Sequence, residues 1–179
     1  MTGAGSIAAV AGGVVFLAAL TYALLFNGLR SAANQVITAR ATIDAELQRR
    51  HELIPELVST VKASAAHERT LIEQLTAALA AGERAAGNQA ATVQADAAMS
   101  ALLPQVFVMA EGVPTLCTSS SFLALQHELV TTEDRLAAAR RYYNFQVRDL
   151  NTLVGSAVSA PIARRHHVVV ADYYGEPPD

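Results

Sequence analysis

Apolar residues recur at helical spacing along most of the chain. In the first half they are three, four or seven residues apart, at Val36, Ile43, Leu47, Ile54, Leu57 and Val61. In the second half the steps are three or four throughout, at Phe122, Leu125, Leu129, Thr132, Leu136, Ala139, Tyr143, Val147, Leu150 and Val154. Such steps mark the buried stripe of a helix. The only strand-like run, residues 166–174, has no obvious partner strand, so the pattern predicts an all-α protein.

Glycine, proline and serine clusters divide this pattern into segments. Loops are expected at residues 81–90, 111–121 and 155–165, which leaves helices near 5–63, 66–83, 88–111 and 120–155. Gly112 can end one helix, and Ser119–Ser121 can cap the next. Ser64 allows a break without requiring one, so residues 33–83 can form one helix or two. The final residues, 175–179, are expected to be a frayed tail.

The first 29 residues contain no lysine or arginine, and residues 5–26 contain no charge at all. A membrane-spanning helix needs about 20 apolar residues. A cleaved signal peptide would begin with a basic region and have a shorter apolar core. We therefore expect an uncleaved transmembrane helix. Because Arg30, Arg40, Arg49 and Arg50 all follow it, the amino terminus is expected outside and the body in the cytoplasm.

The remaining helices must bury their apolar stripes against one another. Short connections make consecutive helices antiparallel neighbours. We expect a membrane anchor at residues 1–29, an antiparallel up-and-down bundle of three to four helices at 30–156, and a carboxy-terminal tail at 157–179. Pro55 lacks an N–H and clashes with the preceding turn. A kink inside one helix is favoured over a new helix starting there, because Ile54 would be a poor cap.

Arg50 lies on the apolar stripe of the first long helix, seven residues from both Ile43 and Leu57. A charge in that position must be paired or must reach the edge of the core. We expect Arg50 to meet Glu133, or failing that Glu128, across the last long helix. A structural polar layer that sets the register between helices is therefore predicted. Its expected members are Arg50, Glu128, Thr132, Glu133, Arg140 and Asn144. The alternative is a small polar pocket formed by Arg50, Glu133, Arg140 and Asn144 and lined also by Tyr143.

Other chemistry has little support in the sequence. Cys117 is the only cysteine, which excludes an intramolecular disulfide, and we expect a buried or incidental thiol. The five histidines show no metal-binding spacing, and no phosphate loop or catalytic motif is present. We expect no metal, no cofactor and no enzymatic activity. The net charge of −3 does not indicate nucleic-acid binding. The basic run at residues 163–167 could contact anionic lipid.

Two blocks of sequence resemble a known family. The first is "IDAELQRRHELIPELVSTVKASAAHE", residues 43–68, and the second is "FLALQHELVTTEDRLAAARRYYNFQVRDLN", residues 122–151. With "AEGVPTL" at residues 110–116 between them, the chain resembles the LemA family of bacterial membrane proteins over residues 30–155. It departs from the family pattern at "VPTLCT", where an aromatic residue and a lysine are usual, and in the tail after residue 155.

The resemblance implies an amino-terminal transmembrane helix and a helical bundle on the cytosolic side, without an established enzymatic activity. We expect a scaffold or adaptor that recruits or organises another protein at the cytoplasmic membrane. The expected partners are the lipid bilayer, an unknown protein and, in the case of self-assembly, further copies of the chain. The alternative function is a ligand sensor or enzyme with a pocket around Arg50 and Glu133.

Overall fold

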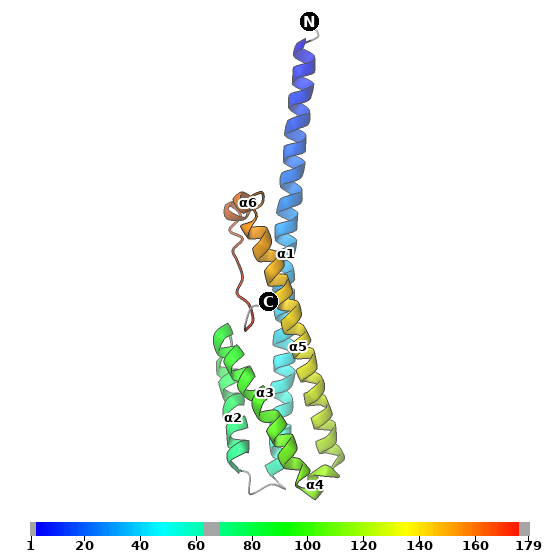
Figure 1. Ribbon diagram of the computed structural model, residues 1–179, viewed down its shortest axis with the longest axis vertical. Helices are drawn as coiled ribbons and strands as arrows, with labels where there is room; N and C mark the ends of the chain where they lie inside the picture. Colours follow the sequence, from blue (N-terminus) through cyan, green and yellow to red (C-terminus); the bar gives the residue numbers. More distant parts are fainter. Residues whose placement is uncertain (1–2, 63–68, 176–179) are drawn as a thin grey trace. The chain divides into compact units, whose positions relative to one another are not determined.

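The computed structural model describes residues 3–62 and 69–175, and all regular secondary structure in them is helical (Figure 1). The helices are α1 (Gly3–Lys62), α2 (Arg69–Arg84), α3 (Gln89–Glu111), α4 (Pro114–Cys117), α5 (Ser120–Gly155) and α6 (Ala160–Arg165). The all-α prediction is confirmed. Residues 33–62 belong to α1 and residues 69–83 to α2, and Ser64, where the sequence allowed a break, lies outside the described residues. In the strand-like run, residues 168–174 adopt neither helix nor strand.

The turn between α2 and α3 is shorter than the loop predicted at residues 81–90. α2 continues to Arg84, whose Nε donates to the Ala80 carbonyl at 2.9 Å. The alanines in this stretch favour helix and outweigh the glycine at position 82. Gly87 takes a left-handed conformation, with φ of 86°, to reverse the chain. Asn88 then caps α3 by accepting a hydrogen bond from the Ala91 N–H.

The connection between α3 and α5 contains a helical turn, α4, that was not predicted. Gly112 ends α3 as expected, but in a right-handed conformation with φ of −77°. Pro114 occupies the first turn of α4, where its missing N–H does no harm. Ser119 Oγ accepts a hydrogen bond from the Phe122 N–H at 3.3 Å, which confirms the predicted serine cap of α5.

The chain divides into two compact units. Unit 1 contains Met1–Ala39 and Tyr143–Tyr173, and unit 2 contains Arg40–Tyr142 and Tyr174–Asp179. The long helices α1 and α5 therefore each contribute one part to each unit.

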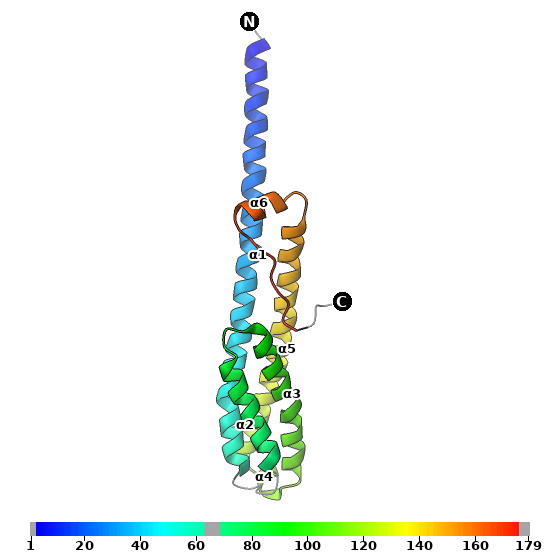
Figure 2. The same cartoon turned by 90° about the vertical axis from the view of Figure 1, so that its left-hand side faces the viewer.

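Unit 2 contains an apolar core to which α1, α2, α3, α4 and α5 all contribute. α2 and α3 lie side by side in both views (Figures 1 and 2). The buried members of the core are Leu53, Ile54, Leu57, Val58, Val61, Ile72, Leu75, Ala78, Leu79, Met99, Leu103, Val106, Ala110, Leu116, Phe122, Leu125 and Leu129. Pro55 lies inside α1 among these residues and does not begin a new helix. Ile54, Leu57 and Val61 of the first predicted stripe therefore share this core with Phe122, Leu125 and Leu129 of the second.

Unit 1 has a smaller core, formed by Leu29 of α1 and by Ile162 and Ala163 of α6. The chain after α6 is attached to α5 through hydrogen bonds between side chains and backbone. Asn151 bonds both the carbonyl and the N–H of Ala171, at 3.0 and 2.9 Å. The Tyr143 hydroxyl donates to the Asp172 carbonyl at 3.0 Å. Residues 160–173 are therefore attached to the rest of unit 1 through Ile162, Ala163, Ala171 and Asp172, whereas 176–179 lie outside the described residues.

Two helices in the described residues are long and apolar enough to cross a membrane. In α3, 33% of the apolar window is buried, and this helix supplies Met99, Leu103 and Val106 to the core of unit 2. In α1, none of the apolar window is buried. The amino-terminal part of α1 is therefore a candidate membrane span, whereas α3 is used as a core helix.

Candidate functional site

Arg50 lies in the interior of unit 2, with only 1% of its surface exposed. Its Nη1 donates to Asp96 Oδ1 of α3 at 2.6 Å. Its Nη2 donates to Ser100 Oγ at 3.0 Å and also to Glu133 Oε2 of α5. A guanidinium has several donors in a fixed planar fork, so one side chain can join two helices to a third. The predicted pair between Arg50 and Glu133 is present, but Arg50 also has a second, fully buried acidic partner.

Asp96 is 2% exposed and connects Arg50 to the other members of the cluster. Its Oδ2 accepts a hydrogen bond from Arg140 Nη2 and, at 3.4 Å, from the Tyr174 hydroxyl. Ser100, which lies in α3 as Asp96 does, donates a hydrogen bond to Glu133 Oε1 of α5 at 3.1 Å. We call Arg50, Asp96, Ser100, Glu133, Arg140 and Tyr174 the charge cluster.

The charges of the cluster balance, because two arginines face two carboxylates. Burial lowers the pKa of Arg50, and the negative charges of Glu133 and Asp96 oppose this shift. Burial likewise raises the pKa of Asp96, against the opposing effects of Arg140 and Arg50. Desolvation is the largest effect in both residues, so burial disfavours the charged form of each, and the ion pairs offset that penalty. Arg140 Nε is buried with no hydrogen-bond partner among the described residues.

Tyr174, near the carboxy terminus of the chain, packs against the charged side chains of the cluster. Its side chain is 4% exposed, and the guanidinium carbons of Arg40 and Arg140 lie 5.4 and 5.8 Å from its ring centre. These distances are typical of cation–π contacts. Burial, reinforced by the negative charge of Asp96, raises the pKa of Tyr174 to about 12. The hydroxyl therefore remains a neutral hydrogen-bond donor to Asp96 at physiological pH.

The structure brings together only some of the residues predicted for the polar layer. Arg50, Glu133 and Arg140 meet in the charge cluster. Glu128 instead pairs with Arg49 at 3.3 Å on the surface, with about half of each side chain exposed. This arrangement follows from helix geometry, because Arg49 lies about 100° around the helix from Arg50.

The other two predicted members also lie outside the cluster. Thr132 is 1% exposed, and its hydroxyl donates to the Glu128 carbonyl one turn earlier at 2.8 Å. Its polarity is thus satisfied within α5 and needs no partner helix. Asn144, together with Tyr143, belongs to unit 1.

Asp96, Ser100 and Tyr174 were missed by the sequence reading. One signal could have identified Asp96, because it is the only charged residue between positions 89 and 110. A single carboxylate in an apolar helix requires a partner, as a single arginine does. Tyr174 had no such signal, since it lies 78 residues from Asp96 and outside any helix.

A groove of about 500 Å³ on unit 2 is lined by residues that include Arg40, Asp44, His51 and Glu83. His51 Nε2 is buried and has no hydrogen-bond partner among the described residues. The ring lies so close to α2 that a Cβ on Gly82 would be 2.9 Å from Nε2. Burial lowers the pKa of His51, with Glu83 and Asp96 raising it and Arg50 lowering it. The neutral imidazole therefore fits this position better than the charged form.

We expect His51 to make stability depend on pH. Its pKa is lower in the folded chain than the ordinary value of 6.5, so the unfolded chain binds more protons below that pH. The His51 contribution should be fully present above pH 6.5 and should decrease as the pH falls below it. Thermal unfolding of His51→Gln should show a weaker acid dependence than the parent chain. His127→Gln, which replaces an exposed histidine, is the control. An unchanged pH dependence in His51→Gln would contradict the assignment.

Cys117 is exposed, so of the two expected cases, a buried thiol or an incidental one, the buried thiol is wrong. Its Sγ lies 3.3 Å from the carbonyls of Ala110 and Glu111. Within the described part of the chain, no three histidine, cysteine, aspartate or glutamate side chains form a group that could hold a metal ion.

The comparisons with known proteins match this chain to one family. A search of curated proteins found no match. A family model described as the LemA family matches residues 39–178. That match covers most of the chain, including every member of the charge cluster, and it extends through the tail that departs from the expected pattern. The chain therefore belongs to the LemA family.

Proposed function

We propose that this protein is a membrane-anchored helical scaffold or adaptor. The amino-terminal part of α1 crosses the cytoplasmic membrane. The other long helices form an antiparallel up-and-down bundle that recruits or organises another protein there. The observation that carries the proposal is the unburied apolar segment of α1, because such a surface is stable only when something apolar covers it.

The apolar segment of α1 has the length and exposure of a membrane span. Every side chain from residue 10 to residue 24 is exposed, including Val10 at 68% and Phe16 at 69%. Residues 5–26 contain no charge, and about 20 such residues suffice to cross a bilayer. A helix that is apolar on all faces and has none of its apolar window buried would be unfavourable in water. These features support insertion into lipid.

The distribution of charge supports an orientation with the body in the cytoplasm. Unit 1, which contains the apolar segment, carries four arginines and two aspartates, although the whole chain has a net charge of −3. The four arginines, Arg30, Arg148, Arg164 and Arg165, all follow the apolar segment in sequence. Basic residues near a span favour the cytoplasmic side. The amino terminus would then lie outside.

The charge cluster supports a structural role more than a ligand pocket. A pocket centred on Arg50 and Glu133 would require ligand access to Arg50, which is 1% exposed and already donates to three side chains. A buried set of paired charges can specify which helices meet and in which register. We therefore favour a non-enzymatic protein whose outer surface, not its interior, meets the partner.

Protease protection tests the anchor and its orientation. Protease added to sealed spheroplasts should leave residues 30–179 intact, whereas the same protease should digest them once the membrane is permeabilised. Digestion in the sealed preparation would reverse the proposed orientation. A mature chain that begins after residue 26 would show that the apolar segment is cleaved and does not anchor the protein.

The same sealed cells can test the scaffold role. A photo-crosslinking residue at Val130, which is 48% exposed on α5, should join the chain to another protein or to a second copy. The matched position is Leu136, which is fully buried and should give no such product. Crosslinks to lipid alone from several exposed positions of unit 2 would contradict recruitment of a protein.

A further inference from the structure

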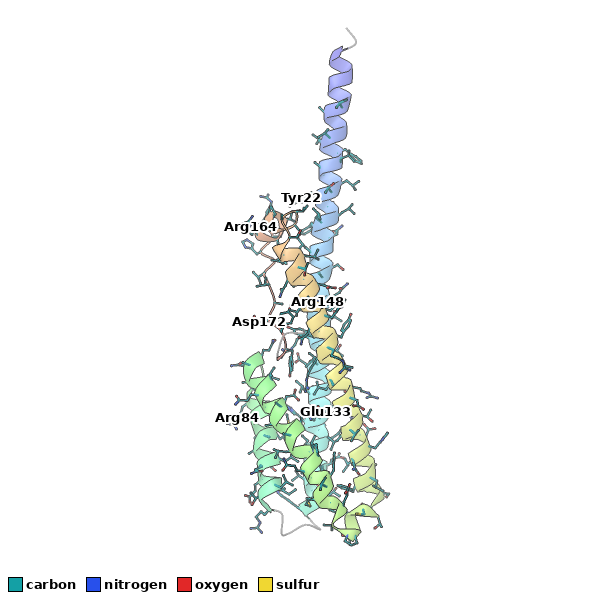
Figure 3. The ribbon with its side chains drawn as sticks, in the orientation of Figure 1. Tyr22, Arg84, Glu133, Arg148, Arg164 and Asp172 are labelled. Carbon is teal, nitrogen blue, oxygen red and sulfur yellow. The ribbon has the colours of Figure 1, made fainter. Side chains whose placement is uncertain are left out.

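The short helix α6 packs against α1 where the unburied apolar segment ends. Tyr22 Oη and His166 Nε2 lie 2.7 Å apart, within hydrogen-bond distance. The Phe26 and His166 rings have their centres 4.3 Å apart. Figure 3 shows Arg164 close to the stretch of α1 that carries Tyr22. These contacts all lie within unit 1, and they attach the end of α6 to the last turns of the apolar segment.

The side chains presented at this end of α6 are basic and are followed by apolar ones. Arg164, Arg165, His166 and His167 are all exposed. Two exposed valines follow, Val169 at 72% and Val170 at 62%. Arginine side chains next to exposed apolar side chains are the combination found in segments that lie at a membrane interface. No acidic side chain occurs between residues 150 and 171 to neutralise the two arginines.

The backbone holds this basic turn in a defined position. His167 adopts a left-handed conformation, with φ of 54°, at the end of α6. The Val168 N–H then bonds the Ala163 carbonyl at 2.9 Å, and the His167 N–H bonds the Arg164 carbonyl at 3.3 Å, which is a Schellman turn. Ala163 is fully buried against the core of unit 1. The arginines therefore project from a packed turn.

We propose that residues 164–167 bind the phosphate of anionic phospholipid head groups in the leaflet where α1 leaves the membrane. The inference rests on the proposed membrane span. If residues 5–26 span the bilayer, Tyr22 and Phe26 lie at its boundary, where aromatic side chains collect. His166 touches both rings, so the neighbouring arginines lie at the level of the head groups. Arginine binds phosphate through two parallel N–H donors, and anionic surfaces attract such residues.

Nanodiscs containing the full chain can test this assignment. We would label Val169→Cys with a spin label in a Cys117→Ser background. Label exposure to an aqueous relaxant would be compared in phosphatidylcholine discs and in discs with three parts phosphatidylcholine to one part phosphatidylglycerol. We expect phosphatidylglycerol to protect the label, and Arg164→Gln with Arg165→Gln to abolish that protection. Two arginines near an anionic surface change a binding equilibrium by roughly 30-fold, or about 1 kcal/mol each.

Two further variants separate lipid binding from effects of charge or folding. Arg135→Gln with Arg141→Gln removes the same charge from exposed positions of unit 2 and should leave the protection intact. Arg164→Lys with Arg165→Lys keeps the positive charge and should retain much of the label protection. Equal protection of the Val169 label in both kinds of disc would overturn the proposal. So would a loss of protection in the Arg135→Gln, Arg141→Gln control that equals the loss in Arg164→Gln, Arg165→Gln. Protection produced by inorganic phosphate in phosphatidylcholine discs would also overturn it, by showing a free-anion site.

A label at Phe16→Cys separates this inference from the proposed membrane span. In both kinds of disc, that label should be protected from the aqueous relaxant and accessible to oxygen dissolved in the lipid. If the Phe16 label is exposed to water, the span itself is wrong and the head-group site falls with it. If the Phe16 label lies in lipid while the Val169 label ignores phosphatidylglycerol, only the head-group site is wrong.

Discussion

Replacing Arg50 with leucine is expected to lower the free energy of unfolding by about 3–5 kcal/mol. The change removes the partner that Asp96 holds at 2.6 Å, and Asp96 is only 2% exposed. Burial already raises the pKa of Asp96, so loss of a neighbouring positive charge should raise it further. Denaturant unfolding of the full chain in mild detergent, followed by circular dichroism, measures the effect. Arg49→Leu changes a half-exposed arginine and should alter stability by no more than about 1 kcal/mol.

A second substitution should recover much of the stability lost in Arg50→Leu, but only if it removes the carboxylate that is left buried without a partner. That carboxylate is Asp96, because Asp96 is buried whereas the Glu133 side chain is 36% exposed and can be hydrated. Arg50→Leu with Asp96→Leu should therefore be more stable than Arg50→Leu with Glu133→Leu. The opposite order would show that Glu133 is the dominant partner, as the sequence alone suggested. If Arg50→Leu has no effect, Arg50 is hydrated and does not lie in the core.

Replacing Tyr174 with alanine is expected to lower the free energy of unfolding by about 3 kcal/mol, as for other buried aromatic side chains. The change removes a 4% exposed ring that contacts Arg40 and Arg140 and a hydroxyl that donates to Asp96. Tyr174→Phe keeps the ring and should cost about 1 kcal/mol, the usual contribution of one hydrogen bond. The difference between the two variants separates the packing of the ring from the hydrogen bond.

Tyr142→Ala is the matched control for Tyr174, because it removes a 52% exposed tyrosine from unit 2. It should change stability by about 0.5 kcal/mol or less. Denaturant unfolding in the same detergent would compare the three variants. Equal stability of Tyr174→Ala and Tyr142→Ala would mean that the ring of Tyr174 is not packed in solution.

Local patterns predicted the helices well, since helix formation depends on residues three or four apart. The apolar steps from Phe122 to Leu150 gave the bounds of α5, and the serine before it was correctly identified as a cap. Errors occurred where two local tendencies competed. Residues 81–84 contain alanine and glycine, and the helical preference prevailed. The turn α4 escaped notice because four residues are too few to show a period.

Only part of the charge cluster could be predicted from the sequence, because contacts between helices are not encoded in local spacing. Arg50 and Glu133 stood out because each charge lies on or beside an apolar stripe, and the structure joins them. Glu128 satisfied the same sequence criterion but pairs with Arg49 on the surface. A position on or beside a stripe shows that a residue lies on the side of its helix that faces other helices, or at the edge of that side. It does not show which residue of another helix it meets.

The sequence by itself determined the helical class, the uncharged apolar segment at residues 5–26 and the need of Arg50 for a partner. These properties follow from the chemistry of single residues and from a period of 3.6 residues, both of which can be read locally. Only the tertiary structure decided that Asp96 is the buried partner and that Tyr174 covers it, across separations of 46 and 78 residues. Such contacts depend on the rotation and axial register of packed helices, because a shift of one residue turns a side chain by about 100° away from its partner.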